Sequence, residues 1–215
     1  MDNPLQGSKI SFDVFETFYE EKRPFFSEGS EFFNHRISLF NSRRIGRRPS
    51  YYIPDNGELE NLADYTTILG ASRVMGSLAS GINYGFIGAF TTEETAIHID
   101  SLDSRDIVVE PKSNYSIGRV EIPMINNISR VGIMATNVTR ANNPGATVIG
   151  TDWTLGFYDN RLFTNGQIIH SNVDSEYGSA YRFNFGYLDP VGWSFRFWYG
   201  TTNDMININD LGYLR

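Results

Sequence analysis

Four arginines in one short segment are the residues of this sequence best suited to bind a ligand. The segment is SRRIGRRP, residues 42–49, and its arginines are Arg43, Arg44, Arg47 and Arg48. Guanidinium groups fork onto carboxylates and phosphates, so the cluster could bind an anion, a sugar acid or a lipopolysaccharide phosphate. The competing interpretation is structural, with these arginines paired to Glu20, Glu21 and Glu28 inside a barrel or plug. Residue types alone leave both open.

The remaining titratable residues predict no metal site and no catalytic centre. Residues 91–106, TTEETAIHIDSLDSRD, are rich in carboxylates but lack EF-hand spacing, so we interpret them as a solvated loop. The three histidines His35, His98 and His170 are far apart and fit no metal-ligand spacing. The chain contains no cysteine and no G-x-S-x-G motif. We therefore expect no metal, no cofactor and no catalytic residues.

Composition excludes two classes of protein. The net charge of −7 argues against a nucleic-acid binder, which usually carries a basic balance. No stretch approaches the ~20 apolar residues that a membrane-spanning helix needs. Aromatic residues make 14% of the chain, which is typical of strands and of the aromatic girdles at membrane interfaces.

From about residue 66 the sequence alternates between large apolar and small or polar residues, which indicates β-strands. Turn-rich dipeptides and tetrapeptides separate the alternating segments, and Asp100–Asp106 and Ala141–Ala146 read as longer loops. The pattern predicts an all-β, antiparallel, up-and-down meander. Its eight expected strands lie near 66–75, 82–97, 107–122, 128–139, 147–158, 162–173, 177–188 and 193–203.

The length of these segments favours a transmembrane β-barrel over a soluble one. Many run for about ten residues, whereas an ordinary strand has ~5–6 and a tilted membrane-spanning strand has ~9–11. One face is aromatic or aliphatic, and we expect it to contact outer-membrane lipid, although it could also stack sugars. The other face carries small polar residues together with Arg182, Asn184 and Arg196, which we expect to face the lumen.

Residues 1–64 lack this periodicity and are expected to form an irregular, plug-like segment that precedes the barrel portion, residues 65–215. FETFYEEKRPFF, residues 15–26, could begin as a short helix that Pro24 would stop. The N-terminus does not look like a signal peptide, although a barrel must be exported. We therefore expect an internal part of a longer precursor.

Several motifs resemble an uncharacterised family of bacterial outer-membrane proteins. They are FETFYEEKRPFFSEG (15–29), SRRIGRRP (42–49), TTILGASRVMG (66–76), VEPKSNYSIGRV (109–120) and NINDLGYLR (207–215). Members of that family carry a signal peptide, a family-9-type carbohydrate-binding-like module and then a long C-terminal β-barrel domain. The resemblance implies that this chain is the early part of that domain, incomplete and continuing beyond residue 215.

These observations lead to one principal hypothesis and two alternatives. The principal hypothesis is a barrel in the bacterial outer membrane with a pore, transport or anchoring role and a glycan as partner; the link to carbohydrate comes from the resemblance alone. The alternatives are a hydrolase with a lumenal active site and a soluble ligand-binding β-barrel. We also predict that this chain by itself does not close into a barrel.

Overall fold

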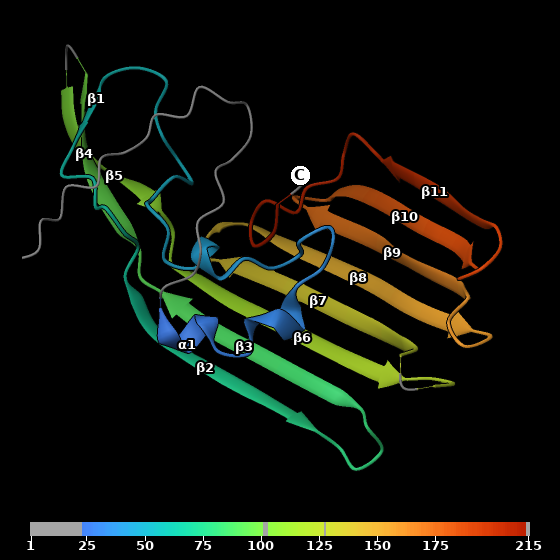
Figure 1. The fold of residues 1–215 in the computed structure, drawn as a ribbon. Coiled ribbons are helices and arrows are strands. Elements are labelled where there is room, and N and C mark those ends of the chain that lie inside the picture. The colour runs from blue at the N-terminus through green and yellow to red at the C-terminus, as the bar shows by residue number, and fades with distance from the viewer. Residues whose placement is uncertain (1–22, 101–102, 127, 214–215) are drawn as a thin grey trace, which may run out of the picture.

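The computed structural model describes residues 23–100, 103–126 and 128–213, and its centre is one large antiparallel sheet (Figure 1). Eight strands lie in the order β11-β10-β9-β8-β7-β6-β3-β2. Their bounds are β2 Ile68–Ser77, β3 Asn83–Thr91, β6 Ser113–Pro123, β7 Arg130–Arg140, β8 Asn143–Phe157, β9 Leu162–Val173, β10 Glu176–Leu188 and β11 Ser194–Thr202. Apart from the β3–β6 step, neighbours in the sheet are consecutive in the chain, so the predicted all-β meander is confirmed.

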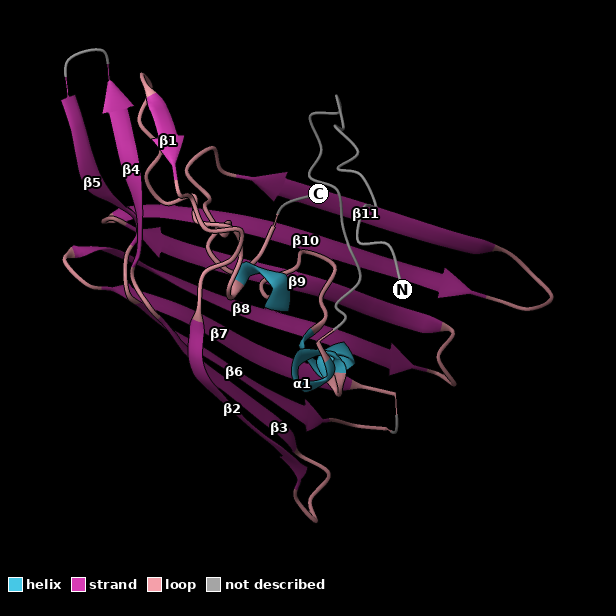
Figure 2. Ribbon diagram, turned by 90° about the vertical axis from the view of Figure 1, so that its left-hand side faces the viewer, coloured by secondary structure: helices cyan, strands magenta, loops and turns pink. Residues whose placement is uncertain are grey.

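A second, three-stranded sheet has the order β1-β4-β5 and interrupts the meander. It contains β1 (Glu58–Glu60), β4 (Glu94–Asp100) and β5 (Asp103–Glu110). The β4–β5 hairpin follows β3 and precedes β6, and Figure 2 shows it projecting beyond the end of the large sheet. After β3 the chain leaves the large sheet, forms the β4–β5 hairpin and re-enters the sheet as β6. β3 and β6 pair with each other there.

The sheet is not closed among the described residues. Strands β2 and β11 lie at its opposite edges and do not pair with each other. The prediction that the chain alone does not form a closed barrel is therefore confirmed.

Two predicted segments were too long, because each spans a junction with the projecting hairpin. The expected strand 82–97 is divided between β3 and β4, and the expected strand 107–122 between β5 and β6. Both predicted long loops were also wrong. Asp103–Glu110 is strand, and Ala141–Ala146 contains a tight turn after which β8 begins at Asn143. Asn142 adopts φ 57°, a left-handed conformation that asparagine tolerates, so a short turn suffices there.

Among the described residues, three short helical turns precede the sheet: α1 (Pro24–Ser27), η1 (Ser30–Phe33) and η2 (Ser42–Arg44). Pro24 is the first residue of α1, and Arg23 before it is extended. In the first turn of a helix the backbone N–H groups have no acceptor within the helix, so the missing N–H of proline costs no hydrogen bond there. The fixed φ of proline also favours the helical conformation. The expected helical start at residues 15–22 lies outside the described residues.

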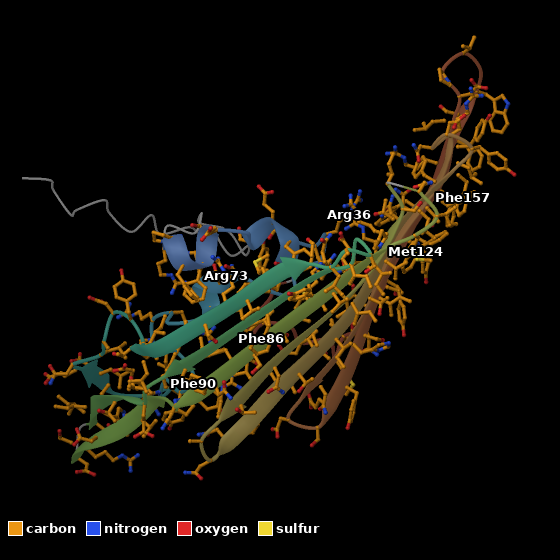
Figure 3. The ribbon with its side chains drawn as sticks, turned by 90° about the horizontal axis from the view of Figure 1, so that it is seen from below. Arg36, Arg73, Phe86, Phe90, Met124 and Phe157 are labelled. Atoms are coloured by element: carbon orange, nitrogen blue, oxygen red, sulfur yellow. The ribbon has the colours of Figure 1, made fainter. Side chains whose placement is uncertain are left out.

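The two faces of the large sheet differ, because only one is covered by other parts of the chain. Figure 3 shows the short helices along one side of the sheet only. Residues 203–213, which include most of the motif NINDLGYLR, lie over the same face, and the Asn41 amide donates to the Leu211 carbonyl at 2.6 Å. The buried core between this covered face and the two terminal segments consists of Phe26, Phe33, Leu39, Phe40, Ile45, Ile87, Ala89, Tyr115, Ile117, Met134, Val138, Ala146, Val148, Ile169, Ala180, Ile206, Ile208 and Leu211.

The opposite side of the sheet, here the bare face, exposes large apolar side chains to solvent. By strand register they alternate with the residues of the covered face. They are Val74, Tyr84, Phe86, Phe90, Val120, Ile122, Ile133, Ile149, Tyr181, Phe183, Phe195, Phe197 and Tyr199.

The β10–β11 hairpin has the predicted division of faces. Phe183 pairs with Tyr199 and Phe185 with Phe197, so these four aromatic residues share the bare face. Arg196 pairs with Gly186, which places it with the other even-numbered positions of β10 on the covered face.

Candidate functional site

The four arginines singled out from the sequence occupy η2 and the loop that follows it. Arg43 and Arg48 are exposed, and Arg44 and Arg47 are half-buried. The Arg47 carbonyl accepts hydrogen bonds from the Thr66 amide at 2.9 Å and the Thr66 hydroxyl at 2.7 Å. This loop is thereby attached to the segment just before β2.

One of the three carboxylates expected to pair with those arginines, Glu28, has a different partner. The Glu28 carboxylate binds Arg73 of β2 at 2.7 Å, so that part of the structural interpretation was wrong. Glu20 and Glu21 lie outside the described residues. Arg23 also holds the SRRIGRRP segment, because its guanidinium donates to the carbonyls of Ser42 at 2.8 Å and Ile45 at 2.9 Å.

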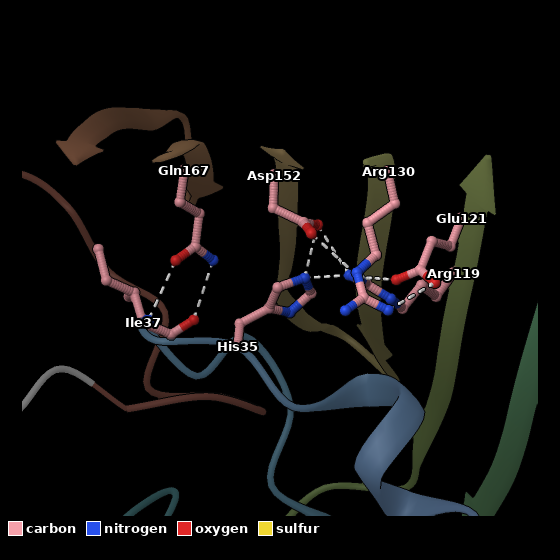
Figure 4. Close-up of polar contacts among 7 residues, drawn as sticks. All are labelled: His35, Ile37, Arg119, Glu121, Arg130, Asp152 and Gln167. Atoms are coloured by element: carbon pink, nitrogen blue, oxygen red, sulfur yellow. Dashed lines mark hydrogen bonds and ion pairs between the residues drawn. The ribbon is translucent and has the colours of Figure 1, made fainter. Parts of the chain in front are cut away.

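A buried charged network on the covered face is the most developed polar site among the described residues (Figure 4). The Arg119 guanidinium forks onto the Asp152 carboxylate, with distances of 2.8 Å and 3.0 Å. His35, from the N-terminal segment, places its Nε2 2.7 Å from Asp152 Oδ2 and also against Arg119. One nitrogen cannot donate to the carboxylate and accept from the guanidinium together, so we assign the Nε2 proton to the stronger, charge-assisted bond with Asp152.

A glycine makes room for the central ion pair of this network. Arg119 lies on β6 and Asp152 on β8, and β7 runs between these strands. On β7 the register places Gly132 beside Asp152, and a Cβ there would lie 2.7 Å from Asp152 Oδ2 and 2.9 Å from Arg119 Nη2. The missing side chain lets the two charged groups meet above the middle strand.

Gln167 of β9 extends the same row of side chains and binds the N-terminal segment through its amide. The Ile37 amide donates to Gln167 Oε1 at 3.0 Å, and Gln167 Nε2 donates to the Ile37 carbonyl at 3.1 Å. The Gln167 side chain thus satisfies both the N–H and the C=O of Ile37, as the backbone of a paired strand would do. Together with His35, it fixes residues 35–37 on the sheet.

The network ends at an open hollow of about 270 Å3 near the β2–β3 and β6–β7 turns. Glu121 and Arg130 line it, 3.8 Å apart, with Asn83 and Ser129 beside them. The Glu121 carboxylate also contacts Arg119 at 3.3 Å. Each carboxylate in this network has a cationic partner, and the arrangement holds the N-terminal segment on the sheet.

Three further buried or paired titratable residues have structural contacts. Glu110 is buried and accepts hydrogen bonds from the Ser50 and Tyr51 amides, each at 3.0 Å. His98 lies 2.7 Å from the Asn56 carbonyl, and His170 contacts the Tyr181 ring on the bare face. Within the described ranges no group of three or more His, Asp or Glu side chains could hold a metal ion.

Sequence reasoning missed the His35–Arg119–Asp152 network, because its members come from distant parts of the chain. His35 and Asp152 are 117 residues apart. One signal was available: Arg119, Glu121 and Asp152 interrupt small or apolar positions on one face of neighbouring strands. Pairing the expected hairpins would have placed these charges together.

Every charged residue of the eight-stranded sheet lies on the covered face by register. These residues are Arg73, Arg119, Glu121, Arg130, Arg140, Asp152, Glu176, Arg182 and Arg196. The bare face of the same strands has no Asp, Glu, Lys or Arg.

Residues 8–215 match the model of a family described as Domain of unknown function (DUF5916), and the chain belongs to this family. No curated protein and no solved structure matches the chain. No helix of the described residues is long and apolar enough to cross a membrane.

Proposed function

We propose that this domain forms part of the wall of a bacterial outer-membrane β-barrel, with a pore, transport or anchoring role linked to carbohydrate. In this proposal the bare face contacts lipid and the covered face lines the interior. Residues 23–57 and 203–213 then lie inside the barrel as a plug. The carbohydrate link comes from the motifs that resemble outer-membrane proteins carrying a carbohydrate-binding-like module.

The observation that carries the proposal is the one-sided distribution of charge in the sheet. An arginine that faces lipid at the bilayer midplane costs about 2–4 kcal/mol, whereas an arginine in the interior stays paired or hydrated. A sheet that excludes charge from its uncovered face and gathers it under the covering segments reverses the arrangement of a soluble protein. In a soluble monomer, an exposed apolar patch larger than a few hundred Å2 is rare.

Strand length supports the same assignment. β9 has 12 residues and β10 has 13, and β8 has 15. A tilted strand needs about 9–11 residues to cross the hydrocarbon core. Large apolar side chains predominate at the bare-face positions of these strands, and Ser116, Asn137, Thr147 and Asn172 form a polar row toward one end of them. An apolar band bordered by polar residues is the pattern of a lipid-facing barrel wall.

Cysteine scanning of the β10–β11 hairpin in the full-length protein tests the proposal. This chain has no cysteine, so each introduced thiol is unique within it. In intact outer membranes, we expect a membrane-impermeant maleimide to leave cysteines at positions 183, 185, 195 and 197 unlabelled. A cysteine at position 196, whose residue is exposed on the covered face, is the matched control and should be labelled if the interior is hydrated.

Efficient labelling at 183, 185, 195 and 197, combined with none at 182, 184 and 196, would contradict the orientation and the membrane assignment. A protein that stays soluble without detergent would favour the alternative of a soluble ligand-binding domain.

A further inference from the structure

A second group of polar and aromatic side chains lies on the covered face near the β11 edge, separate from the His35–Arg119–Asp152 network. It draws on three neighbouring strands, β9, β10 and β11. We call it the arginine-aromatic ledge, and it consists of Phe163, Asn165, Arg182, Asn184, Arg196 and Trp198.

Glycines allow the two aromatic rings of the ledge to lie against the sheet. A Cβ on Gly186 would meet the Phe163 ring at 2.6 Å, and a Cβ on Gly200 would meet the Trp198 ring at 3.3 Å. A large ring that leans over a strand glycine covers backbone and turns a flat surface outward. Trp198 remains 58% exposed, so this surface is open to a ligand.

The two arginines of the ledge lie against aromatic rings and not against carboxylates. The Arg182 guanidinium lies 5.7 Å from the centre of the Trp198 ring, and that of Arg196 lies 5.5 Å from the centre of the Phe163 ring. Within the described part of the chain neither forms an ion pair, whereas Arg119 and Arg130 on the same face do. The ledge therefore keeps two positive charges available to an anion.

Asn184 adds a buried hydrogen-bonding group without a partner. It is only 6% exposed, and its Oδ1 has no hydrogen-bond partner in the described structure. Its Nδ2 lies 3.5 Å from Asn165 Oδ1, a long contact. A buried acceptor without a partner is unfavourable, so this oxygen is suited to accept a hydrogen bond from a ligand hydroxyl.

We propose that the arginine-aromatic ledge binds an acidic oligosaccharide. The C–H faces of sugar rings stack on flat aromatic surfaces, amides bind sugar hydroxyls, and guanidinium groups fork onto sugar carboxylates. The register separates Arg182 and Arg196 by four residues along the strand direction, or about 14 Å between their backbones. That spacing suits two carboxylates on a chain of several sugars and not one small anion. The inference rests on the proposed function only for placing the ledge inside a barrel.

Binding of tri-galacturonate to the detergent-solubilised full-length protein, measured by calorimetry, tests the ledge. We expect tri-galacturonate to bind about tenfold or more tightly than the neutral maltotriose, because charge-assisted contacts add to stacking. Arg182→Gln and Arg196→Gln should each weaken tri-galacturonate binding by about tenfold and leave maltotriose unchanged. Trp198→Ala should weaken the binding of both sugars, because it removes the stacking surface. Arg130→Gln is the matched control on the same face and should change binding less than about twofold.

Absence of tri-galacturonate binding, equal binding of the two sugars, or an equal loss in the Arg130→Gln variant would overturn the inference. Circular dichroism of each variant establishes that the β-sheet is retained, and the exposed Arg196→Gln change tests the site even if Trp198→Ala fails to fold. If tri-galacturonate does not bind but the bare-face cysteines remain protected from maleimide, the sugar-binding role of the ledge is contradicted and the barrel assignment is not. If tri-galacturonate binds but the bare-face cysteines are labelled, the barrel assignment is contradicted and the sugar-binding role of the ledge is not.

Discussion

Arg119 of β6 and Asp152 of β8 form a bidentate ion pair above the strand that separates them, with distances of 2.8 Å and 3.0 Å. The pair is possible because Gly132 on β7 has no side chain to fill that space. His35 joins the pair from the N-terminal segment. Two strands that are not adjacent, β6 and β8, and the segment above them are thus connected through one polar site.

Gly132→Ala should therefore destabilise the fold. The new Cβ would lie 2.7 Å from Asp152 Oδ2, so the ion pair or the strand has to move. Overpacking of this kind typically costs about 1–3 kcal/mol. Gly118→Ala on the bare face is the control, because its Cβ would meet nothing nearer than Phe86 at 4.0 Å. Denaturant unfolding of both variants measures the difference, and equal stability would refute this role of Gly132.

Gln167→Ala should release the N-terminal segment around Ile37. The change removes two hydrogen bonds to the Ile37 backbone, each with a typical net contribution of about 0.5–1.5 kcal/mol. We expect hydrogen exchange at the Ile37 amide to accelerate by about tenfold. Asn165→Ala, on the same strand and face, has no bond to that segment and should leave this exchange rate unchanged. Unaltered exchange in the Gln167 variant would show that other contacts hold the segment.

Charge on the bare face should impair assembly in a bilayer according to its position in the apolar band. Ile133→Arg places a charge within the band, at a cost of about 2–4 kcal/mol if the site lies near the midplane. Thr147→Arg places the same charge in the polar row of the bare face, where the expected cost is about 0–1 kcal/mol. Urea titration of folding into lipid vesicles compares the two. Equal costs would speak against a lipid-facing band.

Acid should weaken the junction between the large sheet and the β4–β5 hairpin. Burial raises the pKa of Glu94, but hydrogen bonds from the Thr67 amide and the Thr92 hydroxyl outweigh burial and hold the pKa below its usual 4.5. A depressed carboxylate pKa contributes stability above the unfolded-state value, and the contribution is lost as pH falls through the folded-state pKa. An NMR titration of the Glu94 carboxyl should give a midpoint below 4.5; a midpoint at or above 4.5 would contradict these bonds.

The regular part of the fold was predictable from the sequence because it follows a local rule. A period of two identifies strand faces, and it placed β9 at 162–173, the bounds that the structure has. The projecting hairpin was missed because β3 and β4 join without a strong turn signal, and because Pro111 between β5 and β6 was included in one long expected strand. The alternating pattern has no marker for a strand that leaves one sheet and enters another.

The site was less predictable, because it depends on contacts between distant residues. The sequence placed Arg182, Asn184 and Arg196 on the face opposite the aromatic residues, which the register confirms. It did not single out His35 or Gln167, whose partners lie 117 and 130 residues away. An isolated histidine or glutamine has no local pattern that reveals a clamp, and only the pairing of the strands shows it.

Fluorescence quenching by lipid is the most direct measurement of the central claim, that the bare face contacts hydrocarbon. Single cysteines at positions 197 and 196 of the full-length protein are labelled with bimane, and the protein is reconstituted with lipids brominated along the acyl chain. These neighbours on β11 face opposite sides of the sheet. The account predicts strong quenching at 197 and little at 196. Equal quenching at both positions, or none at 197, would contradict it.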